Sequence, residues 1–235
     1  MHGSVRATVL AMTGLALLAG PAAGGSRPRA DFSMDFSAKR PNAGTAIHLQ
    51  ILYKGADPQA KPSPIRKIVL RAPRGTRFDS QALPRCRASD EELRAYGDDA
   101  CPRASRLGSG TLTAMTGLPG PSGTVATNVT IYNTPTGFVE LVKEASSGKP
   151  VATDRFRIEG RTWTATPPDT PGGPPDGKTA VRKIDFTYAP KARWAITPRG
   201  CPKSRRWRSS GTFTYADGVT VRVPDRTPCK RVPAR

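Results

Sequence analysis

The side chains able to perform acid–base chemistry are few in this sequence. Only two histidines occur, His2 and His48, so few positions could supply the histidine that a Ser-His-Asp triad needs. A G-x-S-x-G elbow, a P-loop, a dinucleotide fingerprint and an H-E-x-x-H pair are all absent. Carboxylate pairs are left, because glycoside hydrolysis needs only two suitably spaced acids. Six acids lie in or beside expected strands: Asp35, Asp79, Glu140, Glu159, Asp185 and Asp217.

The most distinctive functional stretch is basic and reads KSRRWR. Lys203, Arg205, Arg206 and Arg208 flank Trp207 in it. A guanidinium beside an aromatic ring can stack on the ring face and bind phosphate or carboxylate in a fork. The stretch therefore predicts a binding site for an anionic polymer. The alternative is a core Trp207 at a strand start with solvated arginines around it, and for the tryptophan this alternative is preferred.

The charge balance bears on partners. The chain has 37 Lys and Arg against 18 Asp and Glu. Residues 1–25 resemble a secretory signal peptide, with Arg6, an apolar run over 7–20 and a small-residue stretch. Cleavage would remove one base and no acid, which leaves 36 − 18 = +18. So positive a chain is expected to meet anionic cell-wall polymer or acidic polysaccharide, with no specific nucleic acid.

The leader also bears on the compartment. Its apolar run is shorter than the about 20 residues that span a bilayer. We therefore expect a secreted, extracellular or cell-wall associated product with no membrane span after cleavage. An uncleaved membrane anchor is the alternative.

Four cysteines follow the leader: Cys86, Cys101, Cys201 and Cys229. An even number in an exported chain predicts disulfides. Three pairings can be drawn, and the local one, Cys86–Cys101 with Cys201–Cys229, is preferred because each bridge encloses a short excursion. No C-x-x-C occurs and one histidine is left after the leader, so no metal site and no cofactor are expected.

Between the first two cysteines the sequence predicts one short helix. Ser89 and Glu92 have the spacing of a capping box. Acids occupy the first turn, where the helix dipole favours them, and Gly97 is a natural stop. We expect a disulfide-stapled helix at residues 90–96.

Two segments repeat one phrase. Residues 101–113 read CPRASRLGSGTLT and residues 201–214 read CPKSRRWRSSGTFT. Proline after the cysteine suits a strand entry because it lacks a backbone donor. Each phrase predicts a disulfide-anchored strand, beginning at Gly110 and at Gly211. An internal duplication and chance reuse of one solution are both open.

The remaining chain reads as strands and turns. Period-two alternation, typical of half-buried strands, occurs in DFSMDFS, TAIHLQILY, TVATNVTIY, RKIDFTY and GVTVRV, and short apolar runs occur at 68–70 and 138–142. With 24 Pro and 23 Gly and no long helical period, the chain predicts an all-β antiparallel sandwich. Residues 26–235 are expected to form one domain, with the Pro/Gly-rich segment 166–180 as the place for a subdomain break or a stiff crossing loop.

The cysteine-bearing blocks carry a family resemblance. The run GTRFDSQALPRCRASDEELRAYGDDACPRASRLGSGTLTA, and later PGGPPDG, CP and FTYADG before a closing cysteine, resemble a family of exported all-β proteins from high-GC Gram-positive bacteria. The resemblance spans most of the mature chain and supports the local disulfide pairing, since each pair lies inside one block. It implies no activity, and KSRRWR is more basic than is usual there.

These observations favour an exported, non-enzymatic β-sandwich that adheres to anionic cell-surface polymers. Two alternatives stay open: an extracellular carbohydrate-active enzyme using paired carboxylates, and a protein-interaction module. The oligomeric state is not predictable from the sequence.

Overall fold

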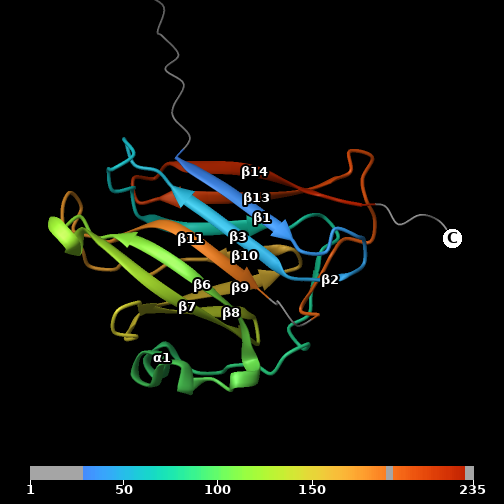
Figure 1. Cartoon of the computed structure of the whole chain (residues 1–235), viewed down its shortest axis with the longest axis horizontal. Coiled ribbons are helices and arrows are strands. Elements are labelled where there is room, and N and C mark those ends of the chain that lie inside the picture. The colour runs from blue at the N-terminus through green and yellow to red at the C-terminus, as the bar shows by residue number, and fades with distance from the viewer. Residues whose placement is uncertain (1–28, 189–192, 231–235) are drawn as a thin grey trace, which may run out of the picture.

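The computed structural model describes residues 29–188 and 193–230, so the predicted signal peptide lies outside the described residues. It confirms the all-β antiparallel class (Figure 1). Eleven strands form one sheet, in spatial order β1 (Ala30–Phe36), β3 (Ile47–Tyr53), β11 (Ala180–Tyr188), β6 (Arg106–Met115), β7 (Thr124–Thr134), β8 (Gly137–Glu144), β9 (Pro150–Glu159), β10 (Thr162–Ala165), β4 (Ile65–Arg71), β13 (Arg206–Tyr215) and β14 (Thr220–Pro228). A small second sheet contains β2 (Gly44–Thr45), β12 (Ala195–Ile196) and β5 (Arg77–Phe78).

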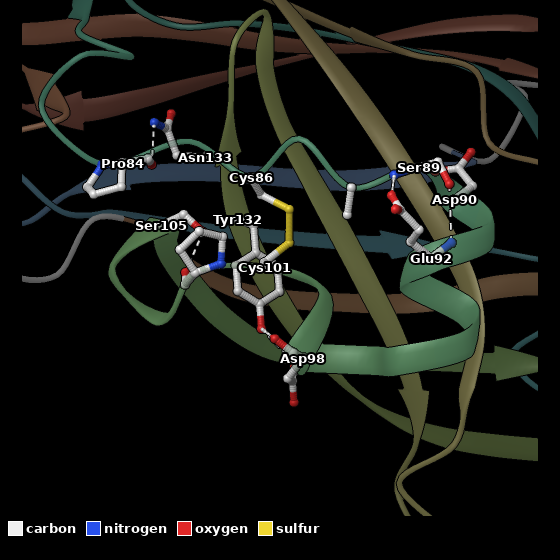
Figure 2. Close-up of a disulfide and its surroundings, with 12 residues drawn as sticks. Pro84, Cys86, Ser89, Asp90, Glu92, Asp98, Cys101, Ser105, Tyr132 and Asn133 are labelled. Atoms are coloured by element: carbon white, nitrogen blue, oxygen red, sulfur yellow. Dashed lines mark hydrogen bonds between the residues drawn. A yellow bond between two sulfur atoms is a disulfide. The ribbon is translucent and has the colours of Figure 1, made fainter.

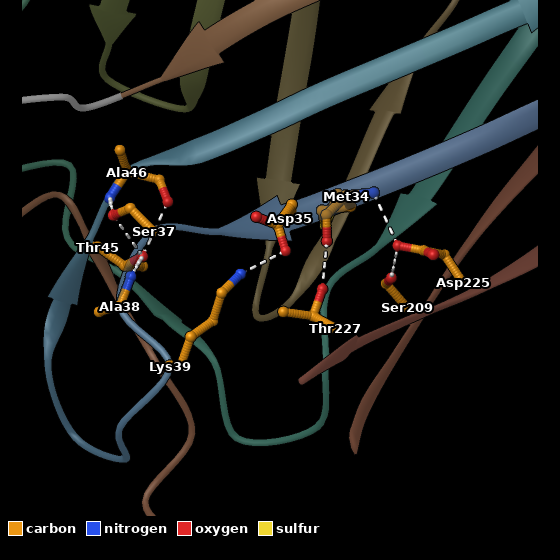
Figure 3. Close-up of polar contacts among 10 residues, drawn as sticks. All are labelled: Met34, Asp35, Ser37, Ala38, Lys39, Thr45, Ala46, Ser209, Asp225 and Thr227. Atoms are coloured by element: carbon orange, nitrogen blue, oxygen red, sulfur yellow. Dashed lines mark hydrogen bonds and ion pairs between the residues drawn. The ribbon is translucent and has the colours of Figure 1, made fainter. Parts of the chain in front are cut away.

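The large sheet curls until its first and last strands meet, which makes it a nearly closed sandwich. Side chains, not a backbone ladder, join the two edges (Figure 3). The Met34 amide of β1 donates to Asp225 Oδ2 of β14 at 2.9 Å, and Thr227 Oγ1 donates to the Met34 carbonyl at 2.7 Å. Every neighbouring pair within the sheet is antiparallel, so the first and eleventh strands run parallel across this seam.

Alternation places the core as the sequence predicts. In β1, Phe32, Met34 and Phe36 are 7%, 0% and 0% exposed. A large aromatic group fills the centre, with Trp163, Trp194 and Phe138 all buried and their rings in contact. Burying each such side chain stabilises the fold by about 1.5–3 kcal/mol.

The predicted apolar face of β14 is only partly confirmed. Val221 and Val223 are half-buried, and Val219, in the turn before the strand, is 44% exposed. The reason is position, because β14 is the last strand of the sheet and forms a backbone ladder with β13 only.

The helix prediction is confirmed residue by residue. α1 spans Asp90–Tyr96, Glu92 N donates to Ser89 Oγ at 3.2 Å, and Ser89 N donates to Glu92 Oε2 at 2.7 Å (Figure 2). Gly97 ends the helix with a φ of 59°. Three short 3₁₀ turns are also present: η1 (Gly97–Ala100), η2 (Arg103–Ser105) and η3 (Gly120–Gly123). No helix among residues 29–188 and 193–230 has the length and apolarity needed to cross a bilayer.

The helix and its disulfide cover the outer face of β7 and β8. Leu93 of α1 packs with Cys86, Cys101, Val139 and Leu141 in a small second cluster. Residues 137–142 are consequently buried on both faces of the sheet. This explains why the sequence there reads as a continuous apolar run and not as an alternation.

Both disulfides have the predicted local pairing, Cys86–Cys101 and Cys201–Cys229. Each repeated phrase leads from its bridge into the first strand of a hairpin, β6–β7 and β13–β14. The predicted starting points were too late: β6 begins at Arg106 and β13 at Arg206. Arg106 in the first phrase and Arg206 and Arg208 in the second join the ladder, with their side chains exposed to solvent.

The glycine shared by the two phrases has a packing role. A Cβ on Gly110 would come within 2.6 Å of Phe186 Cδ1, and one on Gly211 within 2.5 Å of Phe213 Cζ. In both strands an aromatic ring lies over the glycine backbone. Such a site tolerates no side chain, which gives Ser-Gly-Thr a physical reason in each phrase.

The Pro/Gly-rich segment 166–180 connects β10 to β11, two strands far apart in the sheet. Lys61 holds it, with Nζ donating to Asp176 Oδ1 at 2.6 Å and to the Lys178 carbonyl at 2.6 Å. The strands before and after it share one hydrophobic core. The segment lies at the end of the sandwich where β10 ends and β11 begins.

Candidate functional site: an arginine-lined groove

A groove of about 630 Å³ lies where the end of β4, the β9–β10 hairpin and the outer side of β13 and β14 meet. Cys201 and Pro202 of the second repeated phrase line it too. Six arginines contribute to its wall: Arg71, Arg74, Arg161, Arg206, Arg208 and Arg222. The described lining contains no acidic residue.

Strand pairing assembles this wall from distant sequence positions. Along the start of β13, exposure alternates, so that Arg206 and Arg208 face solvent while Trp207 faces the core. Further along the strand, Ser210 lies opposite Arg71 of β4, and Thr212 lies opposite Arg222 of β14. Residues directly opposite in an antiparallel pair share a face, so these arginines share the outer face with Arg206 and Arg208.

The hairpin arginine is fixed in place. Arg161 Nη1 donates to the Ala72 carbonyl at 2.6 Å, and the Ala72 amide donates to the Arg161 carbonyl at 3.0 Å. These two bonds tie the β9–β10 hairpin to the end of β4, and Arg161 is half-buried while the other five are exposed.

The groove arginines lack acid partners. Eleven ion pairs occur among the described residues, and none involves any of the six. Arginines elsewhere do have partners, such as Arg29 with Asp217 at 2.7 Å and Arg155 with Asp90 at 2.7 Å. The groove is thus a concentration of uncompensated guanidinium groups, each able to form a bidentate contact with phosphate or carboxylate.

The structure divides the five predicted binding residues. Arg206, Trp207 and Arg208 line the groove, whereas Lys203 and Arg205 are exposed on the preceding loop and do not. Arg205 has a structural task instead. Its φ is 53°, its amide donates to the Pro202 carbonyl at 2.9 Å, and its carbonyl accepts from the Cys229 amide at 2.8 Å.

Trp207 is a core residue, the placement that the sequence analysis preferred. It is 3% exposed, its ring meets Phe36 edge to face at 6.2 Å, and its Nε1 donates to the Gly200 carbonyl at 3.0 Å. A ligand base or sugar has no free face of this ring to stack on. The arginines are therefore the remaining candidates for binding an anionic polymer.

Sequence reasoning missed four of the six groove arginines. Arg71 and Arg74 follow the apolar run at 68–70, and Arg161 sits in the turn between two strands that were not predicted. Arg222 does carry a signal, since it alternates with Val221 and Val223 and so belongs to the wet face of its strand. What the sequence lacks is the pairing of β13 with β4, which joins residues about 140 positions apart.

Five of the six candidate catalytic acids lie on the outside and do not converge. Each is engaged locally: Asp35 by Lys39, Asp79 by the Gln81 amide, Glu159 by Arg157, Asp185 by His48 and Asp217 by Arg29. The hydrogen bonds from His48 and from Arg29 lower the pKa of the Asp185 and Asp217 carboxyls respectively. Only Glu140 is internal, at 3% exposed.

Known proteins offer little by comparison. No family model matches the chain, and no curated protein matches it. Among solved structures, the group B streptococcus pilus 2b backbone protein is similar with a TM-score of 0.28 and 13% sequence identity, over 84% of this chain and 56% of that chain. This chain thus aligns with little more than half of that one, and so low a TM-score carries no argument about function.

Proposed function

We propose that this protein is exported, is not an enzyme, and adheres to an anionic cell-surface polymer through the arginine-lined groove. The observation that carries the proposal is the convergence of six arginines without one acidic partner among the described residues. Two disulfides and no free cysteine in the described chain support export, because such bonds persist in oxidising compartments.

The chemistry of the groove favours a polymer over a small anion. Its arginines come from β4, the loop after β4, the β9–β10 hairpin, β13 and β14. A repeating chain of phosphodiesters or uronates can present a charge to several of them at once, and each contact adds to the same bound state. The formal charge of +19 for the whole sequence adds long-range attraction that is not specific to the groove.

The test is binding of the mature protein to polyglycerol phosphate and to polygalacturonate over a range of salt. Replacing Arg71, Arg206 and Arg208 with alanine should weaken binding at least ten-fold. It should also flatten the log–log salt dependence by about 0.7–0.9 per lost contact, on a nucleic-acid scale.

The matched control removes three charges elsewhere. The residues replaced are exposed, do not line the groove and form no ion pair among the described residues: Arg66, Arg87 and Arg103. Their alanine variant should lose little. Equal losses from the two triple variants would show a diffuse field with no site and would contradict the proposal. Salt-independent binding of a protein partner would favour the interaction-module alternative.

A further inference from the structure

The inside of the sandwich contains a second site of opposite chemistry. A cavity of about 340 Å³ lies between the inner faces of β3, β4, β6, β8, β9 and β11. Its walls are largely aliphatic and aromatic, as with Leu49, Ile68 and Phe186. It reaches the surface near the strand ends, where Val151, Pro168 and Asp169 are exposed. Its volume is within the range of small-molecule sites.

The charged residues of the cavity are all acidic. Glu140, Glu144, Asp154 and Asp169 line it, and no described lysine or arginine does. Bases outnumber acids 37 to 18 in the sequence, so this lining reverses the composition of the chain. The two rim acids have partners, since Asp169 accepts from Lys178 Nζ at 2.6 Å and Glu144 accepts from Ser147 Oγ at 2.5 Å.

The two inner acids face each other. Glu140 of β8 lies directly opposite Asp154 of β9 in the ladder, which places their Cβ atoms about 4.5–5.5 Å apart on one face. Neither forms an ion pair with a basic side chain of the described residues. Glu140 Oε1 accepts from Tyr188 Oη at 2.9 Å, and among the described residues this is the one hydrogen bond to either carboxyl.

Polar atoms in the cavity are left without partners. Asp154 Oδ1 and the hydroxyl of Tyr53 are both buried and unbonded, and both residues line the cavity. Tyr53 is 1% exposed. Buried polar atoms in native proteins nearly always form a hydrogen bond, and leaving such an atom without one costs about 1–3 kcal/mol. An unbonded hydroxyl and carboxylate oxygen in an apolar cavity point to a bound molecule that completes them.

We propose that this cavity binds a small lipophilic amine, with its apolar body against the aliphatic walls and its ammonium group between Glu140 and Asp154. The ammonium has three donors and no acceptor. It can donate to both carboxylates, and its positive charge compensates two acids that otherwise repel each other in a poorly hydrated space. A neutral alcohol has a single O–H donor and brings no charge, and a fatty acid adds a third carboxyl.

The protonation behaviour of the pair agrees with this assignment. Burial raises the pKa of Glu140, and the neighbouring Asp154 raises it further. Burial raises the pKa of Asp154 to about 6, with Asp90 contributing. The groups facing the pair are Tyr53 and Tyr188, and neither supplies a cation. An ammonium placed between the two carboxyls would favour their ionised forms.

The test uses three probes with one alkyl chain: decylamine, decanol and decanoate, each titrated calorimetrically into mature protein at pH 8 and below its aggregation concentration. Decylamine should bind with one-to-one stoichiometry and at least ten-fold more tightly than decanoate. The surface charge of the protein predicts the reverse order, because a strongly positive chain attracts the carboxylate. Tighter binding of decanoate would therefore overturn the proposal.

Two variants locate the site. The double change Glu140→Gln and Asp154→Asn keeps shape and removes charge, and it should weaken decylamine at least ten-fold while leaving decanol within about three-fold. Ala114→Phe fills the cavity from β6 and should weaken all three probes, which keeps the test decisive if the double variant does not fold. The control double change Glu159→Gln and Asp185→Asn removes two exterior acids and should change nothing.

Two further outcomes would count against the site. Unchanged decylamine binding in the double variant would overturn it. So would hydrolysis of an aryl glycoside that Glu140→Gln abolishes, since that would assign the acid pair to catalysis. The proposal does not depend on the arginine groove, and the Arg71, Arg206 and Arg208 variant should bind decylamine as the wild type does.

Discussion

The arginine groove and the acidic cavity differ in what their charges cost. The groove arginines are mostly exposed, so water solvates them whether or not a ligand is present. Glu140 is buried beside Asp154, and desolvation raises the pKa of both carboxyls. An exposed charge keeps its hydration and costs almost no free energy, whereas a buried charge without a partner carries a large desolvation free energy. The two regions therefore differ in the cost of their charges as well as in sign, although the basic stretch is the more conspicuous in sequence.

Strand β9 shows the contrast within four consecutive residues. Asp154 and Phe156 face inward and line the cavity, while Arg155 and Arg157 face outward and pair with Asp90 and Glu159. The period of two separates opposite charges onto opposite faces of one strand. Three substitution or titration experiments sharpen this difference between inside and outside.

The largest difference should come from truncating one side chain on each face. Phe138 of β8 is 1% exposed and contacts Phe156, Trp163 and Trp194. Phe138→Ala should lower the free energy of unfolding by about 3–5 kcal/mol through lost burial and a new cavity. Arg208→Ala, outside, should change it by less than about 0.5 kcal/mol. Urea denaturation measures both, and similar values would refute the assignment of faces.

Stability should depend on pH through the inner acids. Asp154 has a pKa raised from 3.8 to about 6, so the folded state binds the proton more tightly than the unfolded state. Its contribution is therefore full below pH about 4 and is lost as pH rises through about 6, by up to about 3 kcal/mol. Glu140, whose pKa is also raised, acts with the same sign.

Denaturation from pH 3.5 to 7 tests this behaviour. Asp154→Asn should flatten the decline, whereas Asp185→Asn should not, because the pKa of that exterior carboxyl is lowered. A wild-type protein whose stability rises between pH 4 and 6 would show that exterior, salt-bridged acids dominate the titration.

The smallest effect concerns repulsion on the outer face. Arg208 of β13 lies directly opposite Arg226 of β14, and like charges in this position are unfavourable. Arg226→Glu should stabilise the fold by about 0.2–1 kcal/mol at low salt. The gain should disappear in 1 M salt, where the screening length falls to about 3 Å. A gain independent of salt would indicate a packing effect.

Local rules predicted local structure well. Ser89 and Glu92 specify the start of α1 without any tertiary contact, Gly97 specifies its end, and the cysteine spacing favoured the observed bridges. The strand β9 was missed because Asp154 interrupts its inner face, Ala152, Asp154, Phe156 and Ile158. The same interruption is the available signal for the cavity, as is Glu140 inside the apolar run at 138–142.

The arginine groove was harder to predict from the sequence. Its halves meet through the pairing of β13 with β4, and register between strands far apart in sequence depends on the whole sheet. The stretch KSRRWR indicates a basic region, and four of its residues line the groove: Ser204, Arg206, Trp207 and Arg208. Trp207 packs inward against Phe36, because burying a large apolar ring at a strand start is more favourable in free energy than exposing it to water.

The seam between β1 and β14 has a mechanical consequence. The described chain begins at one end of β1 and leaves β14 at the opposite end of the parallel pair (Figure 1). Tension between the two chain ends would therefore slide these strands along each other and load the bonds of Met34 to Asp225 and Thr227 together, instead of opening them one after another. The Cys201–Cys229 bridge, immediately beyond β14, transfers part of that force covalently to the entrance of β13. A protein held at one end and pulled at the other would resist in shear, the geometry in which a few hydrogen bonds bear the most load.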